Sequence, residues 1–252
     1  SKRRGVGLAC SLRGVSIGAE ALDVGRVYIE VEEDASIHVN CGLTEQGQGL
    51  RTCLAQIAAE AMGVAFERIT MSETDTAKSP LTGAAIASRG TFIGGNAIFD
   101  AAKTIQGIIA EGVRQCYDAA EGDIVFENER VRFSGREITF TEAVHAAYSV
   151  GLTPTAPGTY VVPKIHWDPE KGYGEAFYSY TYSCHGAEVE VDIDTGEVKV
   201  IHMVGCHDMG RAINPAMAKG QIYGGLVMGM GMAVMEDLAV DPKTTSIQHL
   251  NF

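Results

Sequence analysis

Residues 27–63 read VYIEVEEDASIHVNCGLTEQGQGLRTCLAQIAAEAMG. Apolar and polar residues alternate over 27–31 and again over 37–41, which is typical of two half-buried strands joined by a polar turn. A Gly-rich turn over 44–49 follows, and the next residues carry an apolar stripe at helical spacing: Leu50, Leu54, Ile57, Ala58 and Ala61. Gly63 suits the C-cap of that helix. The stretch therefore predicts a β-hairpin that leads through a Gly-rich loop into a helix.

The same order of elements recurs in the C-terminal part of the chain. Residues 189–193 and 198–204 alternate as two strands around the turn at 194–196. Asn214-Pro215 is typical of an N-cap followed by a first helical turn, and it predicts a helix that runs toward Glu236. Two such segments suggest two related lobes that face each other. Hairpins followed by helices are also common in α+β folds, so internal duplication is one of two interpretations.

The remaining segments predict an α+β fold with mostly antiparallel strands. A first strand is expected over Gly5–Leu12, at the start of a chain that opens without Met, as a portion of a larger protein would. Further along we expect a strand at 69–72, a polar loop at 73–91 and a helix at 96–119. A small hairpin of 124–126 with 131–133, a helix at 141–148 and a Pro-rich connection up to 174 follow. We expect one domain over 1–252, with lobes at about 1–120 and 175–252 joined by the small hairpin, helix and loop region.

Composition and charge disfavour several classes of protein. The chain has 252 residues, a net charge of −12 and a pI near 5.0, so nonspecific binding to nucleic acid or to an anionic membrane is disfavoured. The longest apolar run, Leu226–Met235, is about half the roughly twenty residues that a membrane-spanning helix needs. No apolar segment follows the basic N-terminus, so no signal peptide is expected. Six scattered Cys without a Cys-x-x-Cys pair predict a cytoplasmic protein with reduced thiols.

Two loops carry the residue types of a ligand-binding site. Gln46-Gly47-Gln48-Gly49 lies at a helix start, where free N–H groups and the helix dipole favour a phosphate or a polar heterocycle. The alternative is a tight turn with solvated glutamines. The loop over 79–91 is rich in small residues, and its amides could wrap an anion that Arg89 neutralises. The alternative there is a flexible surface loop.

Two other motifs are weaker candidates. Cys206-His207-Asp208 suggests a zinc site or a nucleophile, but adjacent residues on a strand point to opposite faces, so a zinc-dependent hydrolase ranks last. Glu175 follows a Gly turn and could act as a general base, although an exposed turn acid is the simpler interpretation.

Taken in order along the chain, these segments resemble the molybdenum-binding subunit of the xanthine dehydrogenase/aldehyde oxidase family, in its second, C-terminal molybdopterin-binding domain. The resemblance covers almost the whole chain. It rests on Gly47–Leu50 with Ala55–Glu60, Glu73–Thr76 with Ala87–Thr91, Gly95–Ala97, Ala187–Asp192, Asp208–Gly210, Ile213–Pro215 and Gly220–Gly225. A single Gly-Gln-Gly is weak evidence, whereas this ordered set is specific.

The resemblance implies a site and a reaction. The residues that match the family's cofactor loops are Gln46, Gly47, Gln48, Ala87, Ser88, Arg89, Gly90 and Gln221. The implied cofactor is molybdopterin cytosine dinucleotide with molybdenum. The implied reaction is hydroxylation of an N-heteroaromatic substrate, such as nicotinate or xanthine, or of an aldehyde, with water as the oxygen source. Because this chain has no cluster ligands, the 2Fe-2S centres and the FAD are expected on partner chains.

One departure from the family pattern bears on catalysis. The family's catalytic Glu lies beyond the region that Asn251-Phe252 reaches, and Glu175 precedes the strand at 188–191, where the family has no catalytic acid. We therefore assign no catalytic residue and no metal ligand to this chain. We expect an N-terminal molybdenum half or subunit as a partner, as in the split subunit of a nicotinate dehydrogenase. The competing hypothesis is a non-catalytic interaction module of the same fold that has lost the cofactor.

Overall fold

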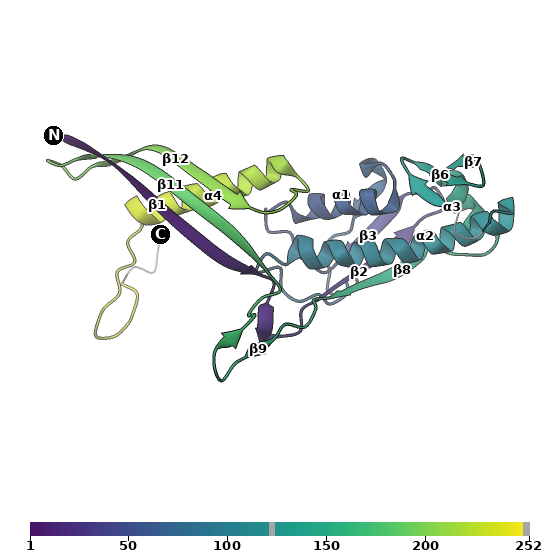
Figure 1. The fold of residues 1–252 in the computed structure, drawn as a ribbon, viewed down its shortest axis with the longest axis horizontal. Helices are drawn as coiled ribbons and strands as arrows, with labels where there is room; N and C mark the ends of the chain where they lie inside the picture. Colours follow the sequence, from purple (N-terminus) through teal and green to yellow (C-terminus); the bar gives the residue numbers. More distant parts are fainter. Residues whose placement is uncertain (121–123, 249–252) are drawn as a thin grey trace. The chain divides into compact units, whose positions relative to one another are not determined.

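The structure is a computed structural model that describes residues 1–120 and 124–248. It has the predicted α+β fold and divides into two compact units (Figure 1). The central unit is Gly14–Tyr180, and the terminal unit combines Ser1–Arg13 with Thr181–Phe252. These boundaries differ from the expected lobes at about 1–120 and 175–252, because the N-terminal strand belongs with the C-terminal part of the chain. A common origin of the two hairpin–loop–helix segments stays a prediction.

The central unit is built on a four-stranded sheet with the order β4-β3-β2-β8. Strands β2 (Val24–Val31) and β3 (Ile37–Cys41) form the predicted antiparallel hairpin, in which Ile29 pairs with Val39. The short strand β4 (Ile69–Met71) is also confirmed and runs parallel to β3. The apolar positions of the hairpin are buried, as the alternation predicts: Val27, Ile29, Val31, Ile37, Val39 and Cys41.

Strand β8 (Thr155–Val161) was not predicted, since this region was expected to be a meandering connection. Pro157 lies within β8 and removes a backbone donor, which usually argues against a strand. Because β8 pairs only with β2, it is an edge strand, where a Pro can face away from the sheet. The same connection also holds a small strand pair, β9 (Trp167–Asp168) with β10 (Tyr173–Gly174).

The helices of the central unit are α1 (Leu50–Met62), α2 (Gly95–Tyr117) and α3 (Phe140–Ser149). Gly63 ends α1 with a φ of 71°, as predicted. Helix α2 lies along β2 and β8 (Figure 1). Gly158 permits the close approach of α2, because a Cβ atom there would lie 2.0 Å from the Ala97 carbonyl oxygen. Gly25 permits that of the turn before α2, because a Cβ atom there would lie 2.3 Å from the Ile93 carbonyl oxygen. A five-residue π-helical turn, Gly90–Gly94, precedes α2 and was not foreseen.

A second, smaller sheet follows α2 in the chain. It consists of β5 (Val125–Glu127), β6 (Arg130–Phe133) and β7 (Arg136–Thr139) in that order. The hairpin of β5 and β6 matches the prediction, and β7 is an additional strand that leads directly into α3.

The terminal unit is a three-stranded sheet with one helix. Its strands are β1 (Lys2–Val15), β11 (Ser179–Asp192) and β12 (Val198–Asp208), in the order β1-β11-β12. Cys206, His207 and Asp208 are the last residues of β12, which extends beyond the predicted strand at 198–204. Helix α4 (Pro215–Val234) begins as predicted, with the Asn214 side chain accepting a hydrogen bond of 3.0 Å from the Met217 amide. Over residues 1–120 and 124–248, no helix has the length and hydropathy needed to cross a bilayer.

Candidate functional site

A hollow of about 360 Å³ in the central unit brings both predicted loops together. Its walls come from residues 46–53 and 85–91, which are far apart in the sequence. The predicted residues that line it are Gln46, Gln48, Ala87, Ser88, Arg89 and Gly90. Gly47, the remaining predicted residue of this unit, lies between the two glutamines with a φ of 96°, a conformation that suits Gly.

The first wall is organised by Glu45, which sequence reasoning missed. Its carboxylate accepts hydrogen bonds from the amides of Gly47 (2.8 Å), Gly49 (2.9 Å) and Arg51 (3.0 Å). Partial burial opposes ionisation of Glu45, but these backbone hydrogen bonds outweigh it and lower the pKa of the carboxyl. The expectation of free N–H groups before α1 and in its first turn is therefore wrong for Gly47, Gly49 and Arg51, because the protein's own carboxylate accepts their hydrogen bonds.

The two glutamines of this wall are held by the loops themselves. The Gln48 side chain donates to the Thr44 carbonyl at 3.1 Å and accepts from the Gln46 amide at 2.5 Å. The Gln46 side chain reaches the Ala85 carbonyl on the opposite wall, at 3.4 Å. Each amide keeps further donor and acceptor capacity, so both side chains can still bind a polar ligand in the hollow.

The second wall carries unusual backbone geometry. Ala87 and Ser88 both adopt left-handed conformations, with φ of 53° and 55°. Such a conformation costs a non-Gly residue about 1–2 kcal/mol, and strain of this kind is concentrated at ligand-binding sites. The amides of Ala87 and Ser88 donate to no acceptor within the described ranges, which leaves them available to a ligand.

The second wall also contains the beginning of a helix. Gly90 and Thr91 line the hollow and open the π-helical turn that continues into α2. The first N–H groups of a helix have no partner within it, and its dipole is positive there. Since Glu45 occupies the start of α1, a negatively charged ligand group is accommodated better at the start of this second helix.

Arg89 borders the hollow, but its guanidinium is engaged within the protein, which differs from the expectation that it neutralises an anion. It is 2% exposed, and its guanidinium donates to Asp23 through Nε (2.8 Å) and Nη2 (2.5 Å). The same group also donates to the carbonyls of Ala84 (2.7 Å) and Val24 (3.2 Å). A buried guanidinium must satisfy its donors within the protein, so Arg89 anchors the loop and cannot neutralise an anion in the hollow.

Gln221, the eighth predicted residue, lies on α4 in the terminal unit and is exposed there. Its convergence with the residues of the hollow stays a prediction.

Glu175 is exposed, and its amide donates to the His166 carbonyl at 2.7 Å. In the described ranges no group of three His, Cys, Asp or Glu side chains is arranged to hold a metal ion, and His207 instead contacts His185, with 2.6 Å between their Nε2 atoms.

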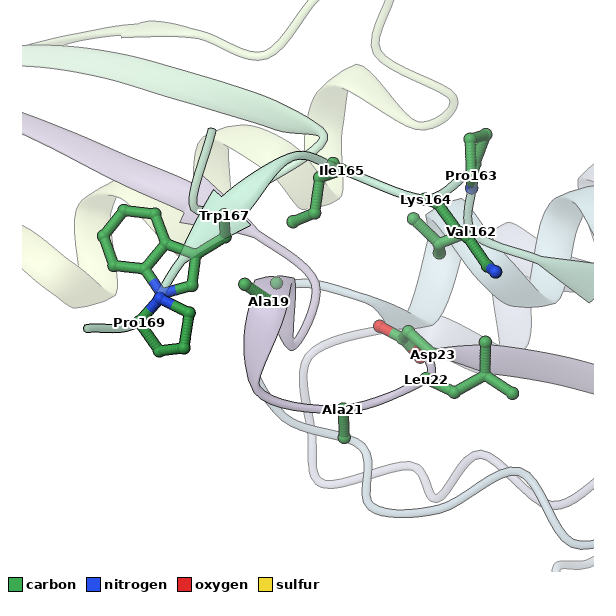
Figure 2. A pocket seen from close by; sticks show the side chains of 11 residues that line it. Ala19, Ala21, Leu22, Asp23, Val162, Pro163, Lys164, Ile165, Trp167 and Pro169 are labelled. Atoms are coloured by element: carbon green, nitrogen blue, oxygen red, sulfur yellow. The ribbon is translucent and has the colours of Figure 1, made fainter. Parts of the chain in front are cut away.

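Asp23 also lines a second hollow of the central unit, of about 430 Å³. Figure 2 shows Asp23 and Leu22 on one wall and the segment with Val162 and Lys164 opposite them, while Trp167 lies farther along. Asp23 and Arg89 thus form a buried ion pair between the two hollows. No local sequence pattern indicates this pair, because the partners are 66 residues apart.

Glu45, by contrast, could have been identified from the sequence, because an acidic residue directly before a Gly-rich helix start is favourably placed to accept hydrogen bonds from its amides.

Comparison with known proteins identifies the family. A model of the molybdopterin cofactor-binding domain matches residues 1–252. Xanthine dehydrogenase of Oryza sativa subsp. japonica is 31% identical over 237 residues, which are 94% of this chain and 16% of that protein. Quinoline 2-oxidoreductase of Pseudomonas putida has a TM-score of 0.82 at 25% identity, over 98% of this chain and 32% of that one.

A third similar protein is the aldehyde oxidoreductase of Desulfovibrio desulfuricans, with a TM-score of 0.74 and 29% identity over 92% of this chain and 23% of that chain. The chain spans only a small part of the relatives it matches, 16% of the rice protein. The family model, the relatives and the solved structures all point to the family that the ordered motifs of the sequence resemble. The chain belongs to the molybdopterin cofactor-binding domain family, as found in xanthine dehydrogenases and aldehyde oxidoreductases.

Proposed function

We propose that this chain is the second molybdopterin-binding domain of a molybdenum hydroxylase, and that the hollow between 46–53 and 85–91 holds part of the cofactor. The observation that carries the proposal is the convergence of Gln46, Gln48 and the strained 87–90 loop on one hollow of about 360 Å³. Gln221 would add a contact from the terminal unit.

The chemistry of the hollow fits a pterin nucleotide. Its glutamine amides can pair with the alternating donors and acceptors of a pterin ring. The free amides of Ala87 and Ser88 and the start of the following helix suit a phosphate. The Glu45 carboxylate on the first wall would repel that phosphate, which favours the second wall for the charged part of the cofactor. The volume lies in the range of pockets that take a small molecule or a portion of a larger one.

Within the assembled enzyme, the bound cofactor supplies the two-electron chemistry that hydroxylates an electron-poor carbon with water as the oxygen source. The residues of this chain bind the pterin nucleotide and fix its orientation, and no residue of the chain is assigned as the base. We propose an N-heteroaromatic substrate such as nicotinate or xanthine. The names of the relatives, which include a xanthine dehydrogenase and a quinoline oxidoreductase, support this class.

The proposed partners are an N-terminal molybdenum-binding half or subunit and chains that carry FAD and 2Fe-2S clusters, in the cytoplasm. The small share of the relatives that this chain covers supports the need for further domains. We propose the cytosine dinucleotide form of the cofactor.

The experiment uses the native complex that contains this chain. Molybdenum is measured by elemental analysis, and the nucleotide released from the cofactor is identified by chromatography. The Gln48→Ala variant should retain several-fold less molybdenum, since one hydrogen bond contributes about 0.5–1.5 kcal/mol. Gln115→Ala is the matched control, because Gln115 lies near the far end of α2 and contacts Glu111.

Cytidine monophosphate is the expected nucleotide, and another nucleotide would refute the cytosine form alone. An active, fully assembled complex without molybdenum would refute the proposed function. Molybdenum content and turnover that are unchanged in Gln48→Ala would favour the interaction module without cofactor.

A further inference from the structure

The 84–90 loop is tied to the start of the central unit by a small buried polar network. Ser16, Asp23 and Arg89 are 1%, 3% and 2% exposed. Asp23 Oδ1 accepts both hydrogen bonds from Arg89, while Oδ2 accepts from the Ser16 hydroxyl and from the Ile17 amide (3.1 Å). Every carboxylate oxygen of Asp23 is therefore engaged, and the network leaves no charge without a partner.

The same network holds the strained part of the loop. The Ser16 amide donates to the Ala87 carbonyl at 2.8 Å, and the Arg89 side chain holds the Ala84 carbonyl at 2.7 Å. Ala87 is thus held at its own carbonyl, and Ser88 lies between that carbonyl and Arg89, whose side chain is held by Asp23. Left-handed geometry at non-Gly residues persists only where the surroundings impose it, and these hydrogen bonds fix the backbone on both sides of Ser88.

We propose that Ser16 and Asp23 are positioning residues for cofactor binding, which act through Arg89 and Ala87 without touching the cofactor. The network fixes residues 87 and 88, which line the hollow, in their left-handed geometry before the ligand arrives, so that binding does not have to order the loop. The inference rests on the proposed function of this hollow.

The location of Asp23 supports a positioning role rather than a ligand role. Asp23 borders the second hollow (Figure 2), whereas the loop that it holds borders the first. Burial opposes ionisation of Asp23, but the hydrogen bonds from Arg89 and Ser16 outweigh this and lower its pKa. The carboxylate therefore stays charged, and the pair with Arg89 stays formed, throughout the neutral range.

The test compares Asp23→Asn and Ser16→Ala with the wild-type complex. The matched control is Asp100→Asn, because Asp100 also binds a backbone amide, that of Thr159 at 2.9 Å, but makes no hydrogen bond to the loop. Amide hydrogen exchange is followed over residues 84–92 and over β2, β3 and α1. In parallel, the half-life of molybdenum loss is measured during prolonged dialysis.

In Asp23→Asn we expect exchange over 84–92 to rise by about tenfold or more, with little change in the sheet, and molybdenum to be lost several-fold faster. Ser16→Ala should act in the same direction but less, because the Ser16 amide still binds the Ala87 carbonyl. The control should match the wild type in both measurements.

A double variant separates positioning from general stability. Asp23→Asn with Arg89→Gln leaves no unpaired buried charge, so the unfolding midpoint should recover toward the wild type, while loop exchange and molybdenum loss stay fast. Unchanged exchange over 84–92 in Asp23→Asn, or an equal rise throughout the sheet and α1, would overturn the inference. A wild-type complex that never contains molybdenum would refute the proposed function alone, since the exchange result still decides whether Asp23 holds the loop.

Discussion

The two units of the chain differ in how they bury their apolar residues. In the central unit, the hairpin of β2 and β3 and the helices α1, α2 and α3 enclose a continuous core. In the terminal unit, Leu226 is the one buried hydrophobic residue among those described. Helix α4 is mostly apolar and, apart from Lys219 and Gln221, carries no charged or amide side chain, yet Tyr223, Val227 and Met228 are exposed by 60% or more. A helix of that composition is normally covered on all sides.

The two units therefore differ in what each can form without a further domain. The central unit contains its own core and a preformed hollow, so its geometry is set by its own sequence. The terminal unit has apolar surface that requires a covering surface from outside the unit. The proposed ligand contacts of Gln48 and the 87–90 loop therefore need only the geometry of the central unit, whereas a contact from Gln221 stays a prediction.

The largest difference in the free energy of unfolding is expected between substitutions in the ion pairs of the two units. Asp23→Ala leaves Arg89 buried without a partner and should cost the central unit about 3–5 kcal/mol in the free energy of unfolding. Glu190→Ala removes the exposed pairs with Lys2 and Arg4 in the terminal unit and should change stability little, because solvent screens such pairs.

Trp167 provides the measurement. It is the chain's single tryptophan and lies in the central unit, so its fluorescence during urea unfolding reports on that unit. If the urea transition of Asp23→Ala coincided with that of the wild type, the buried ion pair of Asp23 and Arg89 would contribute nothing to the stability of the central unit.

The next largest effect concerns apolar contacts. Ile105 on α2 is fully buried, and Ile105→Ala should destabilise the central unit by about 3 kcal/mol through lost contacts and a cavity. Met228 on α4 is 68% exposed, and Met228→Ala should stay within about 0.5 kcal/mol in the isolated chain.

The same Met228→Ala substitution sharpens the comparison when it is made in the full complex. A larger loss of thermal stability in the complex than in the isolated chain would show that assembly covers α4. Equal and small effects in both would mean that α4 is exposed in the assembled protein too, which contradicts the expected covering surface.

A third, smaller difference is expected on acidification. The pKa of Asp23 lies below its ordinary value of 3.8, because the hydrogen bonds from Arg89, Ser16 and Ile17 outweigh burial. A lowered folded-state pKa means that the contribution to stability is complete above the ordinary pKa and disappears as the pH falls below it. Protonation keeps both carboxyl oxygens in place, so the loss should be smaller than in Asp23→Ala.

The measurement is the urea midpoint by Trp167 fluorescence between pH 6 and pH 3. Asp23→Asn should show a shallower decline than the wild type, since it lacks the titrating group. Parallel declines in the two proteins would assign the acid sensitivity to other carboxyls of the central unit, such as Glu129, whose pKa is lowered by its hydrogen bond with Arg68.

The same contrast explains how far the sequence could predict the structure. The β2–β3 hairpin, α1 and its Gly63 cap follow from local spacing, because each residue's burial is decided by neighbours within a few positions. Strand β8 was missed because a Pro such as Pro157 argues against a strand, although an edge strand tolerates it. Edge position is a property of the whole sheet, which no local pattern reports.

The site shows a similar limit. The loops at 46–49 and 79–91 were identified by their small and amide-bearing residues, and the structure brings Gln46, Gln48 and residues 85–91 to one hollow. The function of Arg89 was misjudged because its partner Asp23 lies 66 residues away. The left-handed geometry of Ala87 and Ser88 could not be foreseen either, since the fold imposes it on residues that do not prefer it.

The smallest predicted difference compares helix caps. Thr139 begins α3 with a capping box, in which its side chain accepts from the Glu142 amide at 3.1 Å. Since α3 packs in the core through Phe140 and Val144, Thr139→Ala should lower the free energy of unfolding of the central unit by about 1 kcal/mol. Asn214 caps α4 by the same type of hydrogen bond. Asn214→Ala should loosen only the first turn of α4, because α4 buries little apolar side-chain surface.

The urea transition of Trp167 and hydrogen exchange over residues 215–218 distinguish the two outcomes. Thr139→Ala should shift the fluorescence transition and leave the exchange of α4 unchanged, whereas Asn214→Ala should accelerate exchange at the start of α4 and leave the transition unchanged. An equal shift of the transition by both substitutions would mean that the two units unfold as one cooperative body. In that case the apolar surface of α4 would already be covered in the isolated chain, and the expected need for a covering surface from outside would not hold.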